Sequence, residues 1–265
     1  MVGDPDARTR AIRRAWSAGR YPSLAPNLLP ATAHLVDAAG VDGEDAVLDV
    51  GCGTGNVAIT AARRGASIMG VDIADDMVRF ARSNAALAGD SDVAWSVADA
   101  GSLPVGDATF DVALSNFGHI FAPDVTAATE ELLRAVGSGG RVAFTAWSPG
   151  GLVGDLAAVL GDHLDGDDSD PWSFLDWGDP SYVRERLGDG ADPTFQRRIA
   201  SFRYVSPGHF WREFAEESGP LAPAIRGLHD PERRQHLRRA AIERLEDWFA
   251  DNAVRVEYTL VRVVA

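Results

Sequence analysis

The chain has 265 residues, of which 46% are hydrophobic, enough for one sizeable core or a core with an elaboration. It carries 39 acidic against 25 basic residues, a net charge of −14, and every basic residue is an arginine. Such an acidic surface repels nucleic acids and anionic membranes. A transmembrane helix is not expected, because the chain has no continuous apolar run of about 18 residues.

Two explanations of the acidic, lysine-free composition stay open. It is typical of cytoplasmic proteins of extreme halophiles, and a GC-rich genome also favours arginine over lysine. The charged N-terminal residues lack the apolar stretch of a secretory signal, and a single cysteine, Cys52, excludes an intramolecular disulfide. We expect a cytoplasmic protein, halophilic if the first explanation holds, that is a monomer or homodimer, acts on a small molecule and has no nucleic-acid partner and no membrane insertion.

The first 45 residues are predicted to form N-terminal helices, with apolar residues near the helical period in residues 26–40. Short apolar runs then alternate with helical patterns up to Trp147. In chain order we expect a strand at 46–50, a helix at 56–64, a strand at 67–72, a helix at 74–88, strands at 93–98 and 110–117, a helix at 123–136 closed by the glycine-rich residues 137–140, and a strand at 141–147. This alternation predicts an α/β fold, a parallel sheet with helices on both faces.

After Trp147 the alternation breaks. The patterns predict a helix at 151–164, an acidic loop at 165–171, a helix at 179–188, a strand at 194–205, helices at 207–218 and 231–252, and a last strand that ends the chain. The two late strands are placed to extend the sheet, and the helices between them to cover one end of it.

The stretch LDVGCGTGN, residues 48–56, places three glycines at alternate positions after the first predicted strand. A glycine-rich turn between a strand and a helix is a nucleotide-binding signal. The dinucleotide pattern G-x-G-x-x-G/A fails when counted from Gly51 and passes when counted from Gly53. The glycines alone therefore leave the cofactor open.

Carboxylates at three strand ends narrow the choice. Asp49 lies two residues before Gly51, where it disfavours a pyrophosphate and suits a ligand with an ammonium group. Asp72 ends the second strand, where a carboxylate can accept hydrogen bonds from both ribose hydroxyls, a feature common to both cofactors. Asp99 ends the third strand, where it can accept from an exocyclic adenine amine.

With these residues in place, VLDVGCGTGNVAITAARRGASIMGVDIADDMVRFAR, VADAGSLPVGDATFDVALSNF and LLRAVGSGGRVAFTAW, in this order, resemble the class I S-adenosylmethionine-dependent methyltransferases. The match is to the group similar to the ubiquinone/menaquinone-biosynthesis methyltransferases (type 11), and the flanks resemble an uncharacterised subgroup of it. The resemblance implies a single Rossmann-like domain over 1–265, a seven-stranded, mostly parallel sheet whose last strand is antiparallel. Its parts would be N-terminal helices at 1–45, a cofactor-binding core at 46–147, an acceptor-side helical elaboration at 148–252 and a terminal strand at 253–265.

The resemblance also implies roles for residues at the matching positions. Asp49, Gly51, Cys52 and Gly53 would hold the methionine part of S-adenosylmethionine, and Asp72 would take the ribose hydroxyls. The adenine would be packed and read by Ile73, Met77, Asp99 and the Ala100 amide. The methyl-donor end would be lined by Ser115, Asn116 and Phe117.

Candidates on the acceptor side are Tyr21, His119 and Trp147. Tyr21 would orient donor or acceptor, and His119 would be either a base or a packed histidine. Trp147, with Trp16, Trp172 and Trp177, forms either an aromatic substrate pocket or ordinary core.

We assign no catalytic residue, and the six histidines show no metal-binding pattern. An NAD-dependent oxidoreductase and a non-catalytic S-adenosylmethionine-binding module remain as alternative functions.

Overall fold

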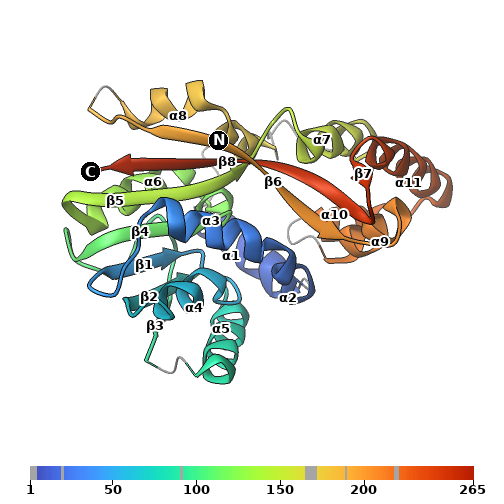
Figure 1. The fold of residues 1–265 in the computed structure, drawn as a ribbon. Coiled ribbons are helices and arrows are strands. Elements are labelled where there is room, and N and C mark those ends of the chain that lie inside the picture. Colours follow the sequence, from blue (N-terminus) through green and yellow to red (C-terminus); the bar gives the residue numbers. More distant parts are fainter. Residues whose placement is uncertain (1–4, 19–20, 90–91, 165–171, 189, 218–220) are drawn as a thin grey trace.

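The computed structural model describes residues 5–18, 21–89, 92–164, 172–188, 190–217 and 221–265. The strands are β1 (Ala46–Val50), β2 (Ser67–Asp72), β3 (Ala94–Val97), β4 (Phe110–Asn116), β5 (Val136–Trp147), β6 (Thr194–Arg203), β7 (Phe249–Ala250) and β8 (Ala253–Val264). They form one sheet in the order β3-β2-β1-β4-β5-β8-β6, and the two-residue β7 pairs with β8 (Figure 1).

The sheet confirms the predicted topology. The pairs formed by β1 with β2, β1 with β4, β2 with β3 and β4 with β5 are all parallel. The last strand, β8, is inserted between β5 and β6 and runs antiparallel to both. Parallel neighbours require crossover connections, and α4 (Asn56–Ala62), α5 (Asp75–Ala88) and α6 (Val125–Ala135) lie within these connections.

The start, the end and the buried face of α5 all follow from its sequence. Asp75 and Asp76 occupy its first turn, where negative charge stabilises the positive end of the helix dipole. Gly89 ends it in the left-handed conformation with φ of 83°. Met77 and Ala81, one turn apart, are both buried against the sheet, which places Met77 beside the end of β2.

The N-terminal region, for which the sequence predicts helices, forms several short elements. These are α1 (Pro5–Ala18), α2 (Tyr21–Leu24), a 3₁₀ turn at Ala25–Leu28 and α3 (Leu29–Ala38). In α1, Arg13 Nε donates to the Ile73 carbonyl at 3.0 Å, and Thr9 Oγ1 donates to Asp99 Oδ2 at 3.4 Å. These bonds fasten α1 to the loops that follow β2 and β3.

The second half supplies α7 (Leu152–His163), α8 (Pro180–Leu187), α9 (Pro207–Glu217), α10 (Leu221–Gly227) and α11 (Pro231–Glu246). In Figure 1, α7, α9, α10 and α11 gather at one end of the molecule, beside the long β6 and β8. The predicted acidic loop 165–171 lies outside the described residues. Among the helices in the described ranges, none has both the length and the apolar character needed to cross a bilayer.

Two boundaries differ from the prediction by several residues. The helix predicted at 231–252 ends at Glu246, because Asp251 and Asn252 adopt left-handed backbone angles, with φ of 52° and 56°, and turn the chain between β7 and β8. Consecutive left-handed residues of this kind are typical of tight hairpins. The glycine-rich residues 137–140 are part of β5 instead of a break before it. The C-terminus keeps them extended, since Gly139 N donates to the Ala265 carbonyl at 2.8 Å and Ala265 N donates to Gly140 at 2.9 Å.

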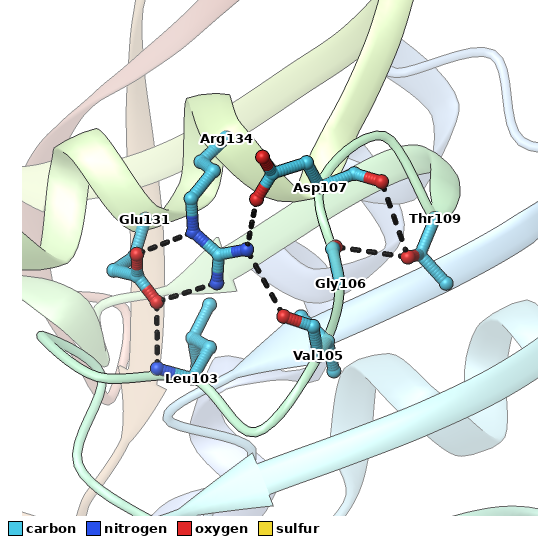
Figure 2. A network of polar contacts seen from close by, with 7 residues as sticks. All are labelled: Leu103, Val105, Gly106, Asp107, Thr109, Glu131 and Arg134. Atoms are coloured by element: carbon cyan, nitrogen blue, oxygen red, sulfur yellow. Dashed lines mark hydrogen bonds and ion pairs between the residues drawn. The ribbon is translucent and has the colours of Figure 1, made fainter.

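A polar network on α6 holds the loop that leads from β3 to β4 (Figure 2). Arg134 donates to both Glu131 carboxylate oxygens at 2.5 and 2.7 Å, to the Val105 carbonyl at 3.0 Å and to Asp107 Oδ1 at 2.7 Å. Glu131 Oε2 also accepts from Leu103 N at 2.7 Å. Arg134 and Glu131 together therefore tie residues 103–107 to the helix and fix the segment that follows Asp99.

Candidate active site

The carboxyl ends of β1 to β4 meet at a cavity of about 620 Å³. β1 has β2 on one side and β4 on the other, so the strand order reverses here, the place where open α/β sheets bind ligands. The cavity is lined by Ile12, Trp16, Tyr21, Val50, Gly51, Gly53, Val71, Asp72, Ile73, Met77, Ala98, Asp99, Ala100, Asn116, Phe117, Gly118, Phe121, Ala122 and Pro123. Its walls therefore come from four strand ends, from α1, from Tyr21 and Met77, and from residues 121–123.

Asp49, at the end of β1, carries an unpaired buried oxygen. Its Oδ2 accepts from Ala58 N at 3.1 Å, whereas Oδ1 has no hydrogen-bond partner among the described residues. The side chain borders a smaller cavity of about 270 Å³ that is also lined by Cys52, Gly53 and Asn116. Burial raises the pKa of Asp49 to about 8, so a cation placed at Oδ1 would strongly favour the ionised form.

Asp72, at the end of β2, is positioned by two backbone amides. Gly53 N donates to its Oδ2 and Ala74 N to its Oδ1, both at 2.9 Å. Burial raises the pKa of this carboxyl, and the two amide hydrogen bonds oppose that shift. Each oxygen keeps further acceptor capacity toward the 620 Å³ cavity, which Asp72 lines.

Asp99 follows β3 and points its carboxylate along its own loop. Gly101 N donates to its Oδ1 at 2.9 Å, which closes a tight turn, and Thr9 of α1 donates to Oδ2. Asp99 and Ala100 both line the 620 Å³ cavity. This loop therefore places the Asp99 carboxylate and the backbone of Ala100 side by side in the cavity wall.

The glycine at position 51 is required by a close backbone crossing. Gly51 has φ of 69°, and a Cβ placed on it would lie 2.6 Å from the Cα of Gly118. Gly118 meets the same limit, since its own Cβ would lie 2.7 Å from the Gly51 carbonyl oxygen. The loops after β1 and β4 thus cross with no room for a side chain on either, which brings both loops to the cavity edge.

Phe117, just after β4, is a bulky residue in a left-handed conformation, with φ of 58°. Such a conformation is uncommon for a large side chain and persists only when neighbours hold it. Its amide donates to Thr145 Oγ1 at 3.0 Å, and its ring stacks on Trp147 with centroids 3.9 Å apart and planes 13° apart. Thr145 also donates to Asn116 Oδ1 at 2.8 Å, so one threonine fixes both residues.

A third, larger cavity of about 1030 Å³ lies beside the first. It shares Trp16, Tyr21, Phe117 and Phe121 with the first cavity. Its remaining walls are side chains from α2, the turn after it, β5, α7, the turn at 173–178, β6, α9 and β8, namely Leu24, Leu28, Trp147, Leu152, Val153, Leu156, Phe174, Phe202, Phe210, Phe214 and Val256. Tyr21 lines all three cavities and thus stands where they meet.

Comparisons with known proteins identify the family to which this chain belongs. Residues 47–140 match a family model described as a methyltransferase domain. An uncharacterized protein of Mycobacterium tuberculosis is 31% identical over 256 residues, which cover 94% of this chain and 92% of the relative. This chain belongs to the class I S-adenosylmethionine-dependent methyltransferases. This confirms the family resemblance predicted from the sequence motifs. The protein is therefore a methyltransferase.

Solved structures agree with the fold of the methyltransferase. A candidate methyltransferase from Bacillus halodurans C-125 superposes with a TM-score of 0.61 at 19% identity, covering 88% of this chain and 97% of that one. The structure of geranyl diphosphate methyltransferase in complex with S-adenosylmethionine has a TM-score of 0.52 at 18% identity, covering 89% of this chain and 84% of that one. At these identities the likeness concerns the fold alone.

Most residues predicted for cofactor binding line the 620 Å³ cavity, the 270 Å³ cavity or both. Asp49 and Cys52 line the 270 Å³ cavity, and Gly51, Gly53 and Asn116 line both it and the 620 Å³ cavity. Asp72, Ile73, Met77, Asp99 and Ala100 line the 620 Å³ cavity. Ser115 lines neither: its buried hydroxyl donates to the Val50 carbonyl at 2.6 Å and accepts from His119 N at 2.9 Å, which ties the end of β4 to β1.

Of the three candidates predicted on the acceptor side, two line the 1030 Å³ cavity and one does not. Tyr21 and Trp147 line the 1030 Å³ cavity, and so does Trp16. His119 lies instead in the core, where its ring meets Phe144 and Trp177 edge-on at 4.5 and 5.6 Å. Neither ring nitrogen has a hydrogen-bond partner among the described residues, and burial lowers the pKa of His119 to about 3. The geometry is that of a packed, neutral histidine, the second of the two interpretations of its sequence position.

Several residues of the site have no signal in the sequence that identifies them. Gly118 is one glycine in NFGH, and only the backbone crossing with Gly51 explains it. Thr32, whose hydroxyl accepts from Asn116 Nδ2 at 3.0 Å, comes from α3, 84 residues away. In the described part of the chain, no three His, Cys, Asp or Glu side chains are grouped so that they could hold a metal ion.

Proposed function

We propose that this methyltransferase moves a methyl group from S-adenosylmethionine to a small organic acceptor by in-line displacement. When bound, the cofactor supplies a methyl group already activated by its sulfonium charge. The observation that carries the proposal is the unpaired, buried Oδ1 of Asp49 beside the glycine turn. Such an oxygen is costly to leave without a partner, and the ammonium group of a methionine moiety would provide one.

The small cavity beside Asp49 would hold that methionine moiety. Its floor is the turn of Gly51, Cys52 and Gly53, and Asn116 faces it from the β4 end. Burial, with Asp72 and Asp49 nearby, raises the pKa of the Cys52 thiol well above its usual range, so the thiol stays neutral. Cys52 thus serves as a small wall residue in this proposal.

The remainder of the cofactor would lie along the ends of β2 and β3. Asp72 would accept hydrogen bonds from the ribose hydroxyls, because two amides already hold its oxygens at the cavity wall. Ile73 and Met77 would pack on the adenine, and the Asp99 carboxylate and the Ala100 amide would read its edge. This order follows the cavity from the end of β1 across β2 to β3.

At the donor end the chain provides alignment instead of a base. Phe117 and Asn116 would line the path of the methyl group, both held by Thr145, and Ser115 would act only by keeping the β4 end on β1. Tyr21 is the one titratable side chain that borders all three cavities, and burial together with Asp72 and Asp49 raises its pKa, so it remains a neutral phenol. Positioning and exclusion of water are then the main contributions of the protein.

Calorimetry with S-adenosylhomocysteine, the product form of the cofactor, tests the proposal. We expect binding in low or molar potassium chloride and none with NAD(H). Because the pKa of Asp49 is raised to about 8, pairing with an ammonium group at pH 7 should release close to one proton, and the release should fall as the pH rises through 8. The heat measured in buffers of different ionisation enthalpy gives this number.

Asp49→Asn supplies the matched variant. It keeps the size and the hydrogen bond from Ala58 but removes the charge, so we expect weaker binding and no pH-dependent proton release. An absence of S-adenosylhomocysteine binding in both salts would overturn the proposal, and binding of NAD(H) in its place would favour an oxidoreductase. Binding without proton release would remove Asp49 from the ammonium site.

A further inference from the structure

The 1030 Å³ cavity has a composition that restricts its occupant. Of its fifteen lining residues, nine are aromatic and six are aliphatic, so none is charged at neutral pH. The polar atoms these side chains can offer are the Tyr21 hydroxyl and the indole N–H groups of Trp16 and Trp147. An ionised ligand in such a cavity would lose its hydration without gaining a counter-charge, which is strongly unfavourable.

The shape of the walls favours rings over a flexible chain. Phe117 and Trp147 present a stacked pair on one side, and Phe210 and Phe214, on α9, form a second stacked pair with centroids 5.6 Å apart and planes 21° apart. Flat faces and edges of this kind make their best contacts with other planar rings.

The 1030 Å³ cavity adjoins the 620 Å³ cavity along the residues that they share. Trp16 meets Tyr21 edge-on at 5.3 Å and Phe121 at 5.4 Å, so these three side chains form one wall between the two spaces. Phe117, held in its left-handed conformation by Thr145, completes this boundary. An occupant of the larger cavity would therefore end at the point where the proposed methyl donor begins.

We propose that the methyl acceptor is an uncharged molecule with fused or linked aromatic rings, seated in the 1030 Å³ cavity with its accepting atom toward Tyr21. This rests on the proposed function. A lone pair of the accepting atom forms the bond to the methyl carbon, the carbon–sulfur bond breaks, and its electron pair stays on sulfur, which becomes a neutral thioether. A proton initially on the accepting atom leaves to water and carries away the positive charge. Tyr21 is a positioning residue that offers a hydroxyl to that atom.

The test uses the full chain and the uncharged aromatic dye N-phenyl-1-naphthylamine, whose fluorescence rises in apolar surroundings. We expect saturable binding, and displacement by 2-naphthol at a concentration about tenfold lower than that needed for 2-naphthoate or for 1-octanol, a charged and a flexible competitor respectively. Equal displacement by 2-naphthoate would overturn the uncharged class, and equal displacement by 1-octanol would overturn the preference for rings.

Two variants locate the binding. Val153→Asp places a charge at a half-buried wall position and should weaken dye binding about tenfold or more, whereas Val205→Asp, at a site 74% exposed and outside the cavity, should leave it unchanged. Trp147→Leu removes one stacked ring without a charge and should weaken binding about fivefold. Unchanged dye binding in both cavity variants would overturn the assignment.

The same samples separate this inference from the function it rests on. S-adenosylhomocysteine should bind Val153→Asp as it binds the parent protein, because Val153 lines neither the 620 Å³ nor the 270 Å³ cavity. Retained S-adenosylhomocysteine binding also shows that this variant is folded. If S-adenosylhomocysteine binds but the dye does not, the acceptor class is wrong and the proposed function stands. If the dye binds and S-adenosylhomocysteine does not, the proposed function is wrong.

Discussion

The 620 Å³ cavity, proposed for the cofactor, is walled by strand ends and loops of residues 46–123 together with α1 and Tyr21. The 1030 Å³ cavity, proposed for the acceptor, is walled mainly by side chains from residues 147–256. In the first, backbone amides, a glycine crossing and carboxylates decide the shape, as at Gly51 and Asp72. In the second, apolar side chains from elements far apart in the sequence decide it, as at Val153 and Phe210. If the two proposed assignments hold, the same enzyme fixes its donor by backbone geometry and its acceptor by side-chain packing. Backbone geometry demands particular residues at particular spacings, whereas many apolar side chains can fill a wall.

Removing the Asp72 carboxylate should have the largest effect on the proposed cofactor cavity. Asp72→Ala deletes the acceptor of two charge-assisted hydrogen bonds to the ribose, each worth about 2 kcal/mol, and should weaken S-adenosylhomocysteine binding about a thousandfold in calorimetry. Asp75→Ala, on the exposed first turn of α5, is the matched control and should bind normally. Dye binding in the acceptor cavity should be unchanged in both. Unaltered S-adenosylhomocysteine affinity in Asp72→Ala would refute the ribose assignment.

His119 lies between Phe144 of β5 and Trp177 of the turn at 173–178, where the first half of the chain packs on the second. Its folded-state pKa, about 3, lies below the usual value of 6.5, so the unfolded state binds more protons between these values. Stability therefore falls as pH drops below about 6.5, and this residue alone should account for about 3 kcal/mol at pH 4.

Replacing His119 by Phe, a ring without buried nitrogens, should flatten that acid dependence, which urea unfolding at pH 7, 5 and 4 would measure. His119→Leu provides a second, smaller replacement in case the phenyl ring does not fit. His236→Gln, on the exposed side of α11, should keep the parent slope. A parent-like slope in both His119 variants would contradict the packed, neutral histidine.

A comparison of two glycines tests how tightly the backbone is packed at the edge of the 620 Å³ cavity. Gly51 and Gly89 both have positive φ, but a Cβ at Gly89 meets nothing within 4 Å, whereas one at Gly51 lies 2.6 Å from Gly118. Gly89→Ala should cost only the conformational strain, about 1 kcal/mol, and Gly51→Ala about 2 kcal/mol more, measured by urea unfolding. Equal costs would show that the crossing of the two loops is not tight.

The smallest effect concerns α1, which covers the cofactor cavity. Arg13→Ala removes the bond to the Ile73 carbonyl and should raise the dissociation rate of S-adenosylhomocysteine about threefold in stopped-flow measurements, because the bond is exposed. The neighbouring Arg14→Ala should change nothing. If the two variants behave alike, the fastening of α1 does not limit cofactor release.

The sequence by itself determined the α/β alternation, the carboxylate positions and the glycine turn, and through them the family. These features are local: a strand, a turn and a helix start can be read from period, glycine spacing and capping residues. The sequence also left His119 undecided between a base and a packed ring, and it offered no reason for Gly118.

Only the tertiary structure decided those matters. The C-terminus holds residues 137–140 in β5, a hairpin shortens the last helix, and β8 is inserted between β5 and β6. The same folding buries His119 and gathers Trp16, Trp147 and Phe210, up to 194 positions apart, around one apolar cavity. Packing of this kind depends on contacts between distant segments, and apolar side chains carry no mark in the sequence of which partner they will meet.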